Sequence, residues 1–281
     1  MKLSAYHPFR SAKAKEEYLA LYDLQAQKWP IASESRMVET SYGQTFVRIG
    51  GAVGAQPLVL LPGNGANSLC WASDIEALSA SYRTFALDCI YDIGRSVYTR
   101  PLKSPNDFVD WLDQTFTVPE LGDHIHLMGI SYGGWLTSQY ALRFPNRLSK
   151  VVLVAPAATV LPISAGFTLR LLPCIVPYRP YVRMFLGWMF RDSASEAVDR
   201  FADETLLTQR CYLPRNFVLP TVLKDQELQN LKVPALFLVG ENEKLYSAEK
   251  AVRRLNKVAP HVVTETIPRA GHDLIVVQAE M

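Results

Sequence analysis

The chain of 281 residues has few cysteines and lacks a long apolar run. Its most apolar stretch, residues 159–178, is interrupted by Arg170 and by prolines, which makes it a poor membrane span. The first 30 residues carry frequent charges, lack the apolar run of a secretory signal and favour an amphipathic helix. The four cysteines have neither C-x-x-C spacing nor the density of a disulfide scaffold. We therefore expect a reduced, cytoplasmic protein without a membrane span; the cysteines are Cys70, Cys89, Cys174 and Cys211.

A large excess of charge is also missing, because the 29 Lys and Arg residues are nearly balanced by 27 Asp and Glu residues, which gives a formal charge of +2. Domains that bind nucleic acid usually carry a clustered basic stripe, and the sequence has none. Hydrophobic residues make up 49% of the chain and charged residues 20%, which is typical of a globular protein. We expect one domain, residues 1–281, with a well-buried core and no nucleic-acid partner.

Short apolar runs alternate with helical segments along most of the chain. Two strand-like runs around Gly43 predict a hairpin. Five later runs lack polar alternation, which is typical of parallel strands covered by helices on both faces. Residues 68–82, 104–116 and 133–145 are predicted to form crossover helices. The predicted class is α/β with a mostly parallel sheet; the five runs end at Gly63, Asp88, Ser131, Ala157 and Glu241.

This alternation stops between about residues 159 and 230. The segment is rich in Pro, Leu and aromatic residues and contains no clear strand. A structureless loop of this length is improbable inside a compact domain, so we expect a helical cap inserted into the sheet. The strand pattern resumes at Val233.

Ser131 lies where a predicted strand meets a predicted helix, in the sequence GISYGG. Gly129 and Gly133 stand two residues to either side and allow the close backbone approach of a sharp turn. In open parallel sheets, ligands bind at the carboxyl ends of the strands. The spacing alone is weak evidence, but strand, serine and helix together predict a nucleophile elbow.

A serine nucleophile needs a base, and the chain has five histidines. His7 lies in the N-terminal segment and His261 in a predicted surface turn. His124 and His126 stand at the far end of the strand that leads to the serine, and no further ligand cluster there indicates a metal. His272, in a glycine-containing loop after the last strand-like run, is the candidate base.

The base in turn needs a carboxylate that holds its tautomer. Glu241 and Glu243 both follow a predicted strand; Glu241 could be a surface charge, and we favour Glu243 because it lies farther into the loop. The order Ser131, Glu243, His272 is the order nucleophile, acid, histidine expected on an α/β sheet.

An oxyanion needs backbone N–H donors as well. The glycine-rich loop LLPGNGANS allows its backbone to approach a bound carbonyl, so the N–H of Asn64 is one candidate donor. The N–H of Tyr132, at the positive end of the following helix, is the second.

These motifs, in this order, resemble the α/β-hydrolase superfamily and its bacterial carboxylesterase-like branch, from about Ser35 to the end of the chain. The resemblance implies an eight-stranded, mostly parallel sheet with a helical cap after the sixth strand. It also implies catalysis by Ser131, Glu243 and His272 without a cofactor or metal, with Asn64 and Tyr132 as oxyanion donors.

Three features depart from the family pattern. The oxyanion loop begins with Pro62–Gly63 where His-Gly is usual, so its bracing contacts must differ. The acid is glutamate where aspartate is commoner. The chain ends nine residues after His272, where relatives usually carry a closing helix.

The predicted reaction is hydrolysis of a carboxylic ester through an acyl-enzyme on Ser131. The apolar cap favours a small-molecule ester with a hydrophobic group. Hydrolysis of a C–C bond in a diketone-like substrate by the same triad, and a non-catalytic binding protein on the same fold, are the alternatives. The cap arginines could meet a substrate carboxylate, although solvated surface charges are the simpler interpretation; they are Arg170, Arg179 and Arg183.

Overall fold

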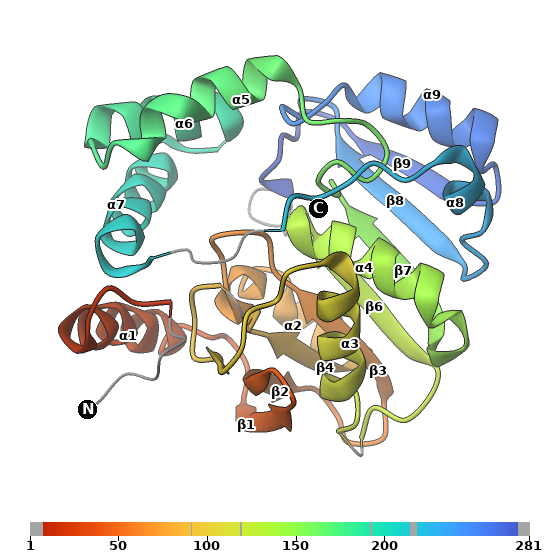
Figure 1. The fold of residues 1–281 in the computed structure, drawn as a ribbon, viewed down its shortest axis with the longest axis horizontal. Coiled ribbons are helices and arrows are strands. Elements are labelled where there is room, and N and C mark those ends of the chain that lie inside the picture. Colours follow the sequence, from red (N-terminus) through yellow and green to blue (C-terminus); the bar gives the residue numbers. More distant parts are fainter. Residues whose placement is uncertain (1–7, 91, 119, 192, 214–217, 275–281) are drawn as a thin grey trace.

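The structure is a computed structural model that describes residues 8–90, 92–118, 120–191, 193–213 and 218–274. Figure 1 shows a sheet flanked by helices, with α5, α6 and α7 set apart from it. The chain end after His272, where the family carries a closing helix, lies largely outside the described residues. Among the helices of the described residues, none is both long enough and apolar enough to cross a bilayer.

Within the described residues the sheet has nine strands, eight of them in the order β1-β2-β4-β3-β6-β7-β8-β9. The pairs from β4 to β9 along this path are parallel, and β1, β2 and β4 pair antiparallel. The predicted mostly parallel sheet is therefore confirmed, as is the hairpin at Gly43 between β1 and β2. The ninth strand, β5, has two residues, pairs only with β2 and was not predicted. The strands are β1 (Ser33–Thr40), β2 (Gly43–Gly50), β3 (Gln56–Leu61), β4 (Tyr82–Leu87), β5 (Val97–Tyr98), β6 (Ile125–Ile130), β7 (Leu148–Val154), β8 (Ala235–Gly240) and β9 (Val263–Ile267).

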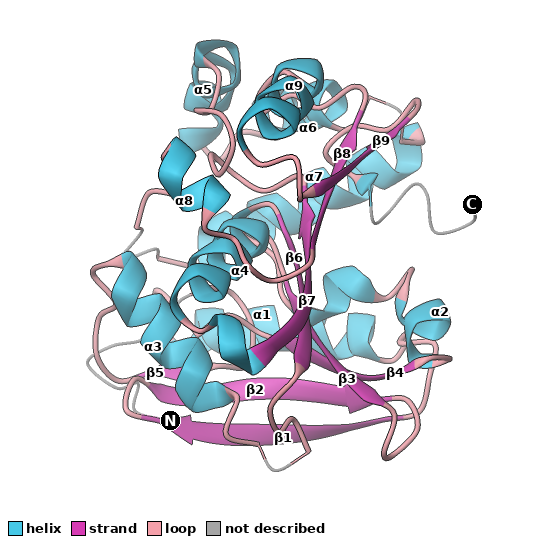
Figure 2. Cartoon of the chain, turned by 90° about the vertical axis from the view of Figure 1, so that its right-hand side faces the viewer, coloured by secondary structure: helices cyan, strands magenta, loops and turns pink. Residues whose placement is uncertain are grey.

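The central strands are apolar throughout because helices cover both faces of the sheet. Along β3, Val59 joins a buried cluster with Trp135, whereas its neighbour Leu60 joins a second cluster with Trp71. Successive side chains of a strand point to opposite faces, so both faces contribute to the core. Figure 2 shows α3 (Pro105–Thr115) and α4 (Tyr132–Arg143) on one side of the sheet and α2 (Ile75–Ser79) on the other.

The predicted N-terminal helix is α1 (Ala12–Ala26), which begins at the N-cap Ser11 and buries Tyr18 and Tyr22. It lies against α7 (Ser195–Cys211), as Figure 1 also shows. The helix expected over residues 68–82 is shorter than predicted. It consists of the 3-10 helix η1 (Ser68–Trp71) and of α2.

Four α-helices and a 3-10 helix lie between β7 and β8 in the described residues. Helix α6 buries Val182, Phe185 and Leu186, whose spacing places them on one face, against Val198 and Ala202 of α7. The helices not yet given are α5 (Ala165–Leu171), η3 (Leu172–Ile175), α6 (Arg179–Met189), α8 (Asp225–Gln229) and, after β8, α9 (Ala248–Val258).

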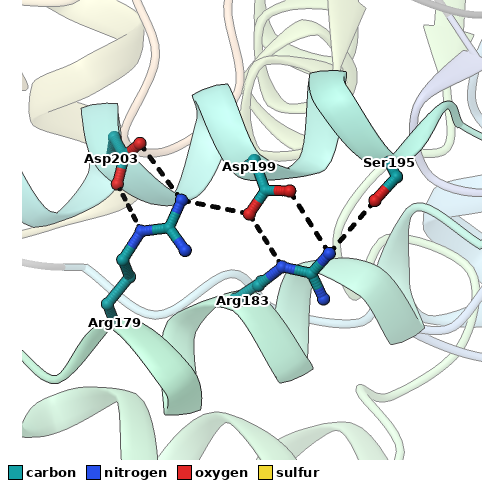
Figure 3. A network of polar contacts seen from close by, with 5 residues as sticks. All are labelled: Arg179, Arg183, Ser195, Asp199 and Asp203. Atoms are coloured by element: carbon teal, nitrogen blue, oxygen red, sulfur yellow. Dashed lines mark hydrogen bonds and ion pairs between the residues drawn. The ribbon is translucent and has the colours of Figure 1, made fainter.

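Two of the cap arginines form ion pairs between α6 and α7 (Figure 3). The Nε atoms of Arg179 and Arg183 donate at 2.7 Å to Asp203 and Asp199, respectively. Arg183 also donates to the hydroxyl of Ser195 at 3.1 Å. All these side chains are partly exposed, so the ion pairs add little to the free energy of unfolding. Their main effect is to fix how α6 and α7 lie against each other. Both arginines are therefore paired with carboxylates of α7.

Candidate active site

Ser131 occupies a strained backbone conformation between β6 and α4. Its φ is 54° and its ψ −115°, outside the regions that L-residues ordinarily adopt. Backbone hydrogen bonds of 2.9 Å hold it there, from its N–H to the carbonyl of Val154 and from the N–H of Ala157 to its own carbonyl. Such strain at a strand–helix junction is typical of functional sites and presents the side chain at the carboxyl edge of the sheet.

The glycines around Ser131 are required by close backbone contacts. A Cβ atom on Gly129 would lie 2.2 Å from the carbonyl oxygen of Gly133, and one on Gly133 would lie 2.5 Å from that of Leu61. A Cβ on Gly63 would lie 3.3 Å from the Cβ of Ser131. The strand, the helix and the loop after β3 therefore converge closely on the serine.

Glu243 and His272 are joined by a hydrogen bond of 2.8 Å between Oε2 of the carboxylate and Nδ1 of the ring. The glutamate side chain is fully buried, and its Oε1 accepts the N–H groups of Lys244 and Leu245 at 2.7 and 2.8 Å. An ionised carboxylate only accepts, so Nδ1 of His272 carries the proton and Nε2 is the basic nitrogen. The carboxylate thus orients the ring and selects its tautomer.

Glu241 has a different partner. Its Oε2 accepts the N–H of Arg269 at 3.0 Å, on the exposed side of the loop. The N–H of Asn242 donates to the carbonyl of Ala270 at 2.8 Å, which ties the loop after β8 to the histidine loop. Of the two glutamates that the sequence left as alternatives, the structure brings Glu243 to the histidine.

Burial alone would lower the pKa of His272, but the charge of Glu243 and the hydrogen bond to it outweigh this effect. The pKa of the ring is therefore raised above its ordinary value. An imidazole of raised basicity accepts a proton from a hydroxyl more readily.

Ser131 and His272 come from the ends of β6 and from the loop after β9, on the same edge of the sheet. Among the described residues, no hydrogen bond joins the Ser131 hydroxyl directly to the His272 ring. In free enzymes, such catalytic contacts are often longer than in the substrate complex.

The loop after β3 forms a tight turn beside Ser131. The N–H of Ala66 donates to the carbonyl of Gly63 at 3.2 Å, and Gly65 has a φ of +73°. Asn64 lies at the exposed tip of this turn. The second predicted donor, Tyr132, begins α4, and its buried side chain donates to the carbonyl of Val218 at 2.7 Å.

Two buried carboxylates beneath this loop were not predicted. Asp92 accepts the N–H of Gly65 at 2.7 Å, and Asp88 accepts the N–H of Ser68 at 2.8 Å. Burial raises the pKa of both, that of Asp92 to about 7. The signal that could have indicated them is their place in the loop that follows β4, at the same sheet edge as the serine.

The two histidines of the H-x-H pair lie at the amino end of β6, away from Ser131. His126 packs its ring against Tyr82, with ring centroids 5.7 Å apart. In the part of the chain that the structure describes, no three His, Cys, Asp or Glu side chains are grouped to hold a metal ion.

Comparison with known proteins agrees with this fold. The sequence matches the Alpha/beta hydrolase family over residues 58–280. It is 32% identical over 263 residues to the "Uncharacterized carboxylesterase nap" of Bacillus subtilis (strain 168), over 92% of this chain and 86% of that protein. It is 29% identical to "Carboxylesterase YbfK" of the same organism, over 97% and 93%. The crystal structure of naproxen esterase (carboxylesterase NP) from Bacillus subtilis superposes with a TM-score of 0.86 at 30% identity, covering 96% of this chain and 95% of that one. The chain therefore belongs to the alpha/beta hydrolase family.

Proposed function

We propose that the protein hydrolyses carboxylic esters that carry a hydrophobic group, through an acyl-enzyme on Ser131. The observation that carries this proposal is the buried 2.8 Å hydrogen bond between Glu243 and His272, on the same sheet edge as the strained Ser131. Acyl transfer needs a base held by a carboxylate, a nucleophile presented at the edge of the sheet, and a loop whose backbone N–H groups can reach the oxyanion.

In the proposed mechanism, Nε2 of His272 takes the proton of the Ser131 hydroxyl as its oxygen bonds to the ester carbonyl carbon. The oxyanion formed accepts hydrogen bonds from the backbone N–H groups of Asn64 and Tyr132. The imidazolium, stabilised by Glu243, gives its proton to the departing alkoxide, which leaves as the alcohol. Water then attacks the acyl-enzyme with His272 again as base, which releases the acid and restores the serine.

We propose that the helices between β7 and β8 act as the cap that selects the substrate. Several large apolar side chains between the start of α5 and the end of α6 are exposed and do not pack into the core. Exposed apolar patches of this kind often mark binding sites. Arg170 stacks 4.7 Å from the ring of Trp188, so it adds to this apolar surface more than it offers a free charge. The exposed side chains are Leu169, Leu171, Leu172, Ile175, Val176, Tyr178, Tyr181 and Met184.

The similarity to two Bacillus carboxylesterases along nearly the full chain supports ester hydrolysis over C–C bond hydrolysis. The pairing of Glu243 with His272 argues against a binding protein without turnover, because a buried carboxylate with no chemical task is costly to keep. We also propose a cytoplasmic location, since the cysteines Cys70, Cys89, Cys174 and Cys211 are free thiols.

The experiment that tests this function is labelling with a fluorophosphonate probe, which reacts with activated serines. Wild-type protein should be labelled, and Ser131→Ala should not. Ser138→Ala is a matched control, because this buried α4 serine donates to the carbonyl of Trp135 and lies outside the site. Absence of labelling in folded wild-type protein, or labelling that survives in Ser131→Ala, would overturn the proposal.

A further inference from the structure

The buried carboxylate of Asp92 has no part in the mechanism above, yet it contacts the oxyanion loop directly. Only 3% of the residue is exposed. Its Oδ2 accepts the N–H of Gly65, and its Oδ1 accepts the N–H of its neighbour Ile93, both at 2.7 Å. Burying a carboxylate is costly unless hydrogen bonds compensate, so these two contacts account for its presence inside the protein.

The contact with Gly65 acts on the turn that carries the candidate oxyanion donor. Asn64 and Gly65 are the central residues of the turn closed by the hydrogen bond from Ala66 to Gly63. A positive φ at the second central residue, here +73°, is the mark of a type II turn. In the alternative type I turn the peptide between Asn64 and Gly65 is rotated, and the N–H of Gly65 would point away from Asp92. The carboxylate therefore favours one of the two turn conformations.

We propose that Asp92 is a positioning residue, which holds the peptide between Asn64 and Gly65 and thereby keeps the turn that carries the N–H of Asn64 in place beside Ser131. The inference rests on the proposed function of Ser131 as a nucleophile. It also gives the loop, which begins with Pro62–Gly63 where the family usually has His-Gly, a bracing contact of its own.

The remainder of the loop has separate anchors. The N–H of Ser68 donates to Asp88 at 2.8 Å, and the amide of Asn67 donates to the hydroxyl of Tyr18 at 3.0 Å. Loss of the Asp92 carboxylate therefore leaves the loop attached at its far end. We expect the effect to appear in the chemical step and not in the fold.

The first test is Asp92→Asn, which keeps the size of the side chain but replaces one acceptor oxygen by a donor. Assays with p-nitrophenyl butyrate at pH 8.5 keep the wild-type carboxyl ionised, because burial raises its pKa only to about 7. We expect kcat to fall roughly 10- to 100-fold with KM within about twofold, since a misplaced oxyanion donor weakens only transition-state binding. Asp74→Asn is the matched control: burial raises the pKa of Asp74 to about 7 as well, but within the described residues no hydrogen bond joins its carboxylate to the turn at Asn64 and Gly65.

The second test changes the turn itself and leaves Asp92 in place. In Gly65→Ala the positive φ becomes strained, while a Cβ at this exposed position meets no atom within 4 Å. We expect kcat to fall as in Asp92→Asn with the fold intact. Gly54→Ala is its control, because Gly54 also has a positive φ, of +85°, and an open surrounding, but lies before β3, at the opposite end of that strand from Gly65.

The rate of fluorophosphonate labelling should fall with kcat in both variants, because the phosphonyl adduct places an oxygen in the same oxyanion site. The inference is overturned if either folded variant keeps wild-type kcat and labelling rate, or if the controls lose as much activity. If Asp92→Asn does not fold, the kcat and the labelling rate of Gly65→Ala alone test the inference. Wild-type protein that is not labelled at Ser131 would overturn the proposed function and this inference together, whereas normal labelling in both variants would overturn this inference alone.

Discussion

The carboxylate of Glu243 makes three hydrogen bonds, two with the backbone of its own loop and one with His272. The backbone contacts fix its orientation, so its charge is held at Nδ1 of the ring. A carboxylate in this place stabilises the imidazolium that forms when the histidine takes a proton. It has this effect without being exposed to substrate.

We predict that Glu243→Gln lowers kcat/KM for nitrophenyl esters by roughly 10²–10⁴-fold, because the neutral amide neither stabilises the imidazolium nor selects its tautomer. The apparent pKa of activity should also move down, since the charge and the hydrogen bond that raise the pKa of His272 are lost while burial remains. Activity requires the neutral ring, so wild-type activity should fall as the pH drops through a midpoint above 6.5.

Glu241→Gln is the matched control. Its carboxylate accepts the N–H of Arg269 and is not bonded to the His272 ring in the described part of the chain, so we expect activity within about threefold of wild type. Steady-state rates measured between pH 5.5 and 9 give both the loss of kcat/KM and the shift in the apparent pKa of activity. A larger loss in Glu241→Gln than in Glu243→Gln would show that the acid is assigned to the wrong residue.

Sequence patterns pointed to the candidate triad more readily than to the contacts that support it. Ser131 became a candidate because the glycines around it form a local motif, and Glu243 and His272 became candidates because they follow strands in an expected order. Asp92 lies 27 positions from Gly65, and no local pattern connects a carboxylate to a backbone N–H so far away. Contacts that only the folded chain creates cannot be predicted from spacing.

The helices between β7 and β8 hold together by a small apolar core and by ion pairs, while leaving apolar side chains exposed. Such a surface binds hydrophobic groups because it removes them from water, at about 25 cal/mol for each Å² buried. Each additional methylene of a bound acyl chain adds up to about 0.8 kcal/mol.

We therefore predict that kcat/KM for p-nitrophenyl esters rises from acetate to at least butyrate, by roughly twofold or more for each two carbons. The rates of Ser131→Ala on the same esters give the background to be subtracted. A preference for acetate over all longer esters would contradict the role proposed for the cap.

The secondary structure was predictable wherever both faces of a strand are buried. The apolar runs that became β3, β6, β7 and β8 lie between helices, so their residues had to be apolar on both faces. Strand β5 escaped prediction because two residues form no pattern. The helix predicted after β3 was wrong in its length, since hydrogen bonds of the 3-10 type at Ala72 and Asp74 interrupt it.

Across the molecule, the groups whose pKa is raised should make stability depend on pH. Burial raises the pKa of Asp74 and Asp92 to about 7, so between pH 4 and 7 the folded protein holds protons that the unfolded chain releases. His272, with its raised pKa, stabilises the folded state at low pH, and this contribution is lost as the pH rises through its folded pKa. All three groups therefore lower the free energy of unfolding as the pH rises.

We predict that the free energy of unfolding falls as the pH rises from 5.5 to 8. Each group protonated only in the folded state contributes a slope of up to about 1.4 kcal/mol per pH unit. Urea unfolding at several pH values measures it, and Asp74→Asn should make the slope shallower. Stability that is constant or increases over this range would contradict the prediction.

Helix α1 bears on where a functional unit of this family begins. Tyr18 holds Asn67, and Tyr22 lies within hydrogen-bond distance of Ser68, so the helix supports the oxyanion loop from outside the family match at residues 58–280. A domain boundary placed at the start of the family match would separate α1 from the loop that it supports. A gene trimmed to that match would remove α1 together with β1 and β2, whereas a fusion partner joined close to α1 would disturb the loop after β3 without touching Ser131, Glu243 or His272.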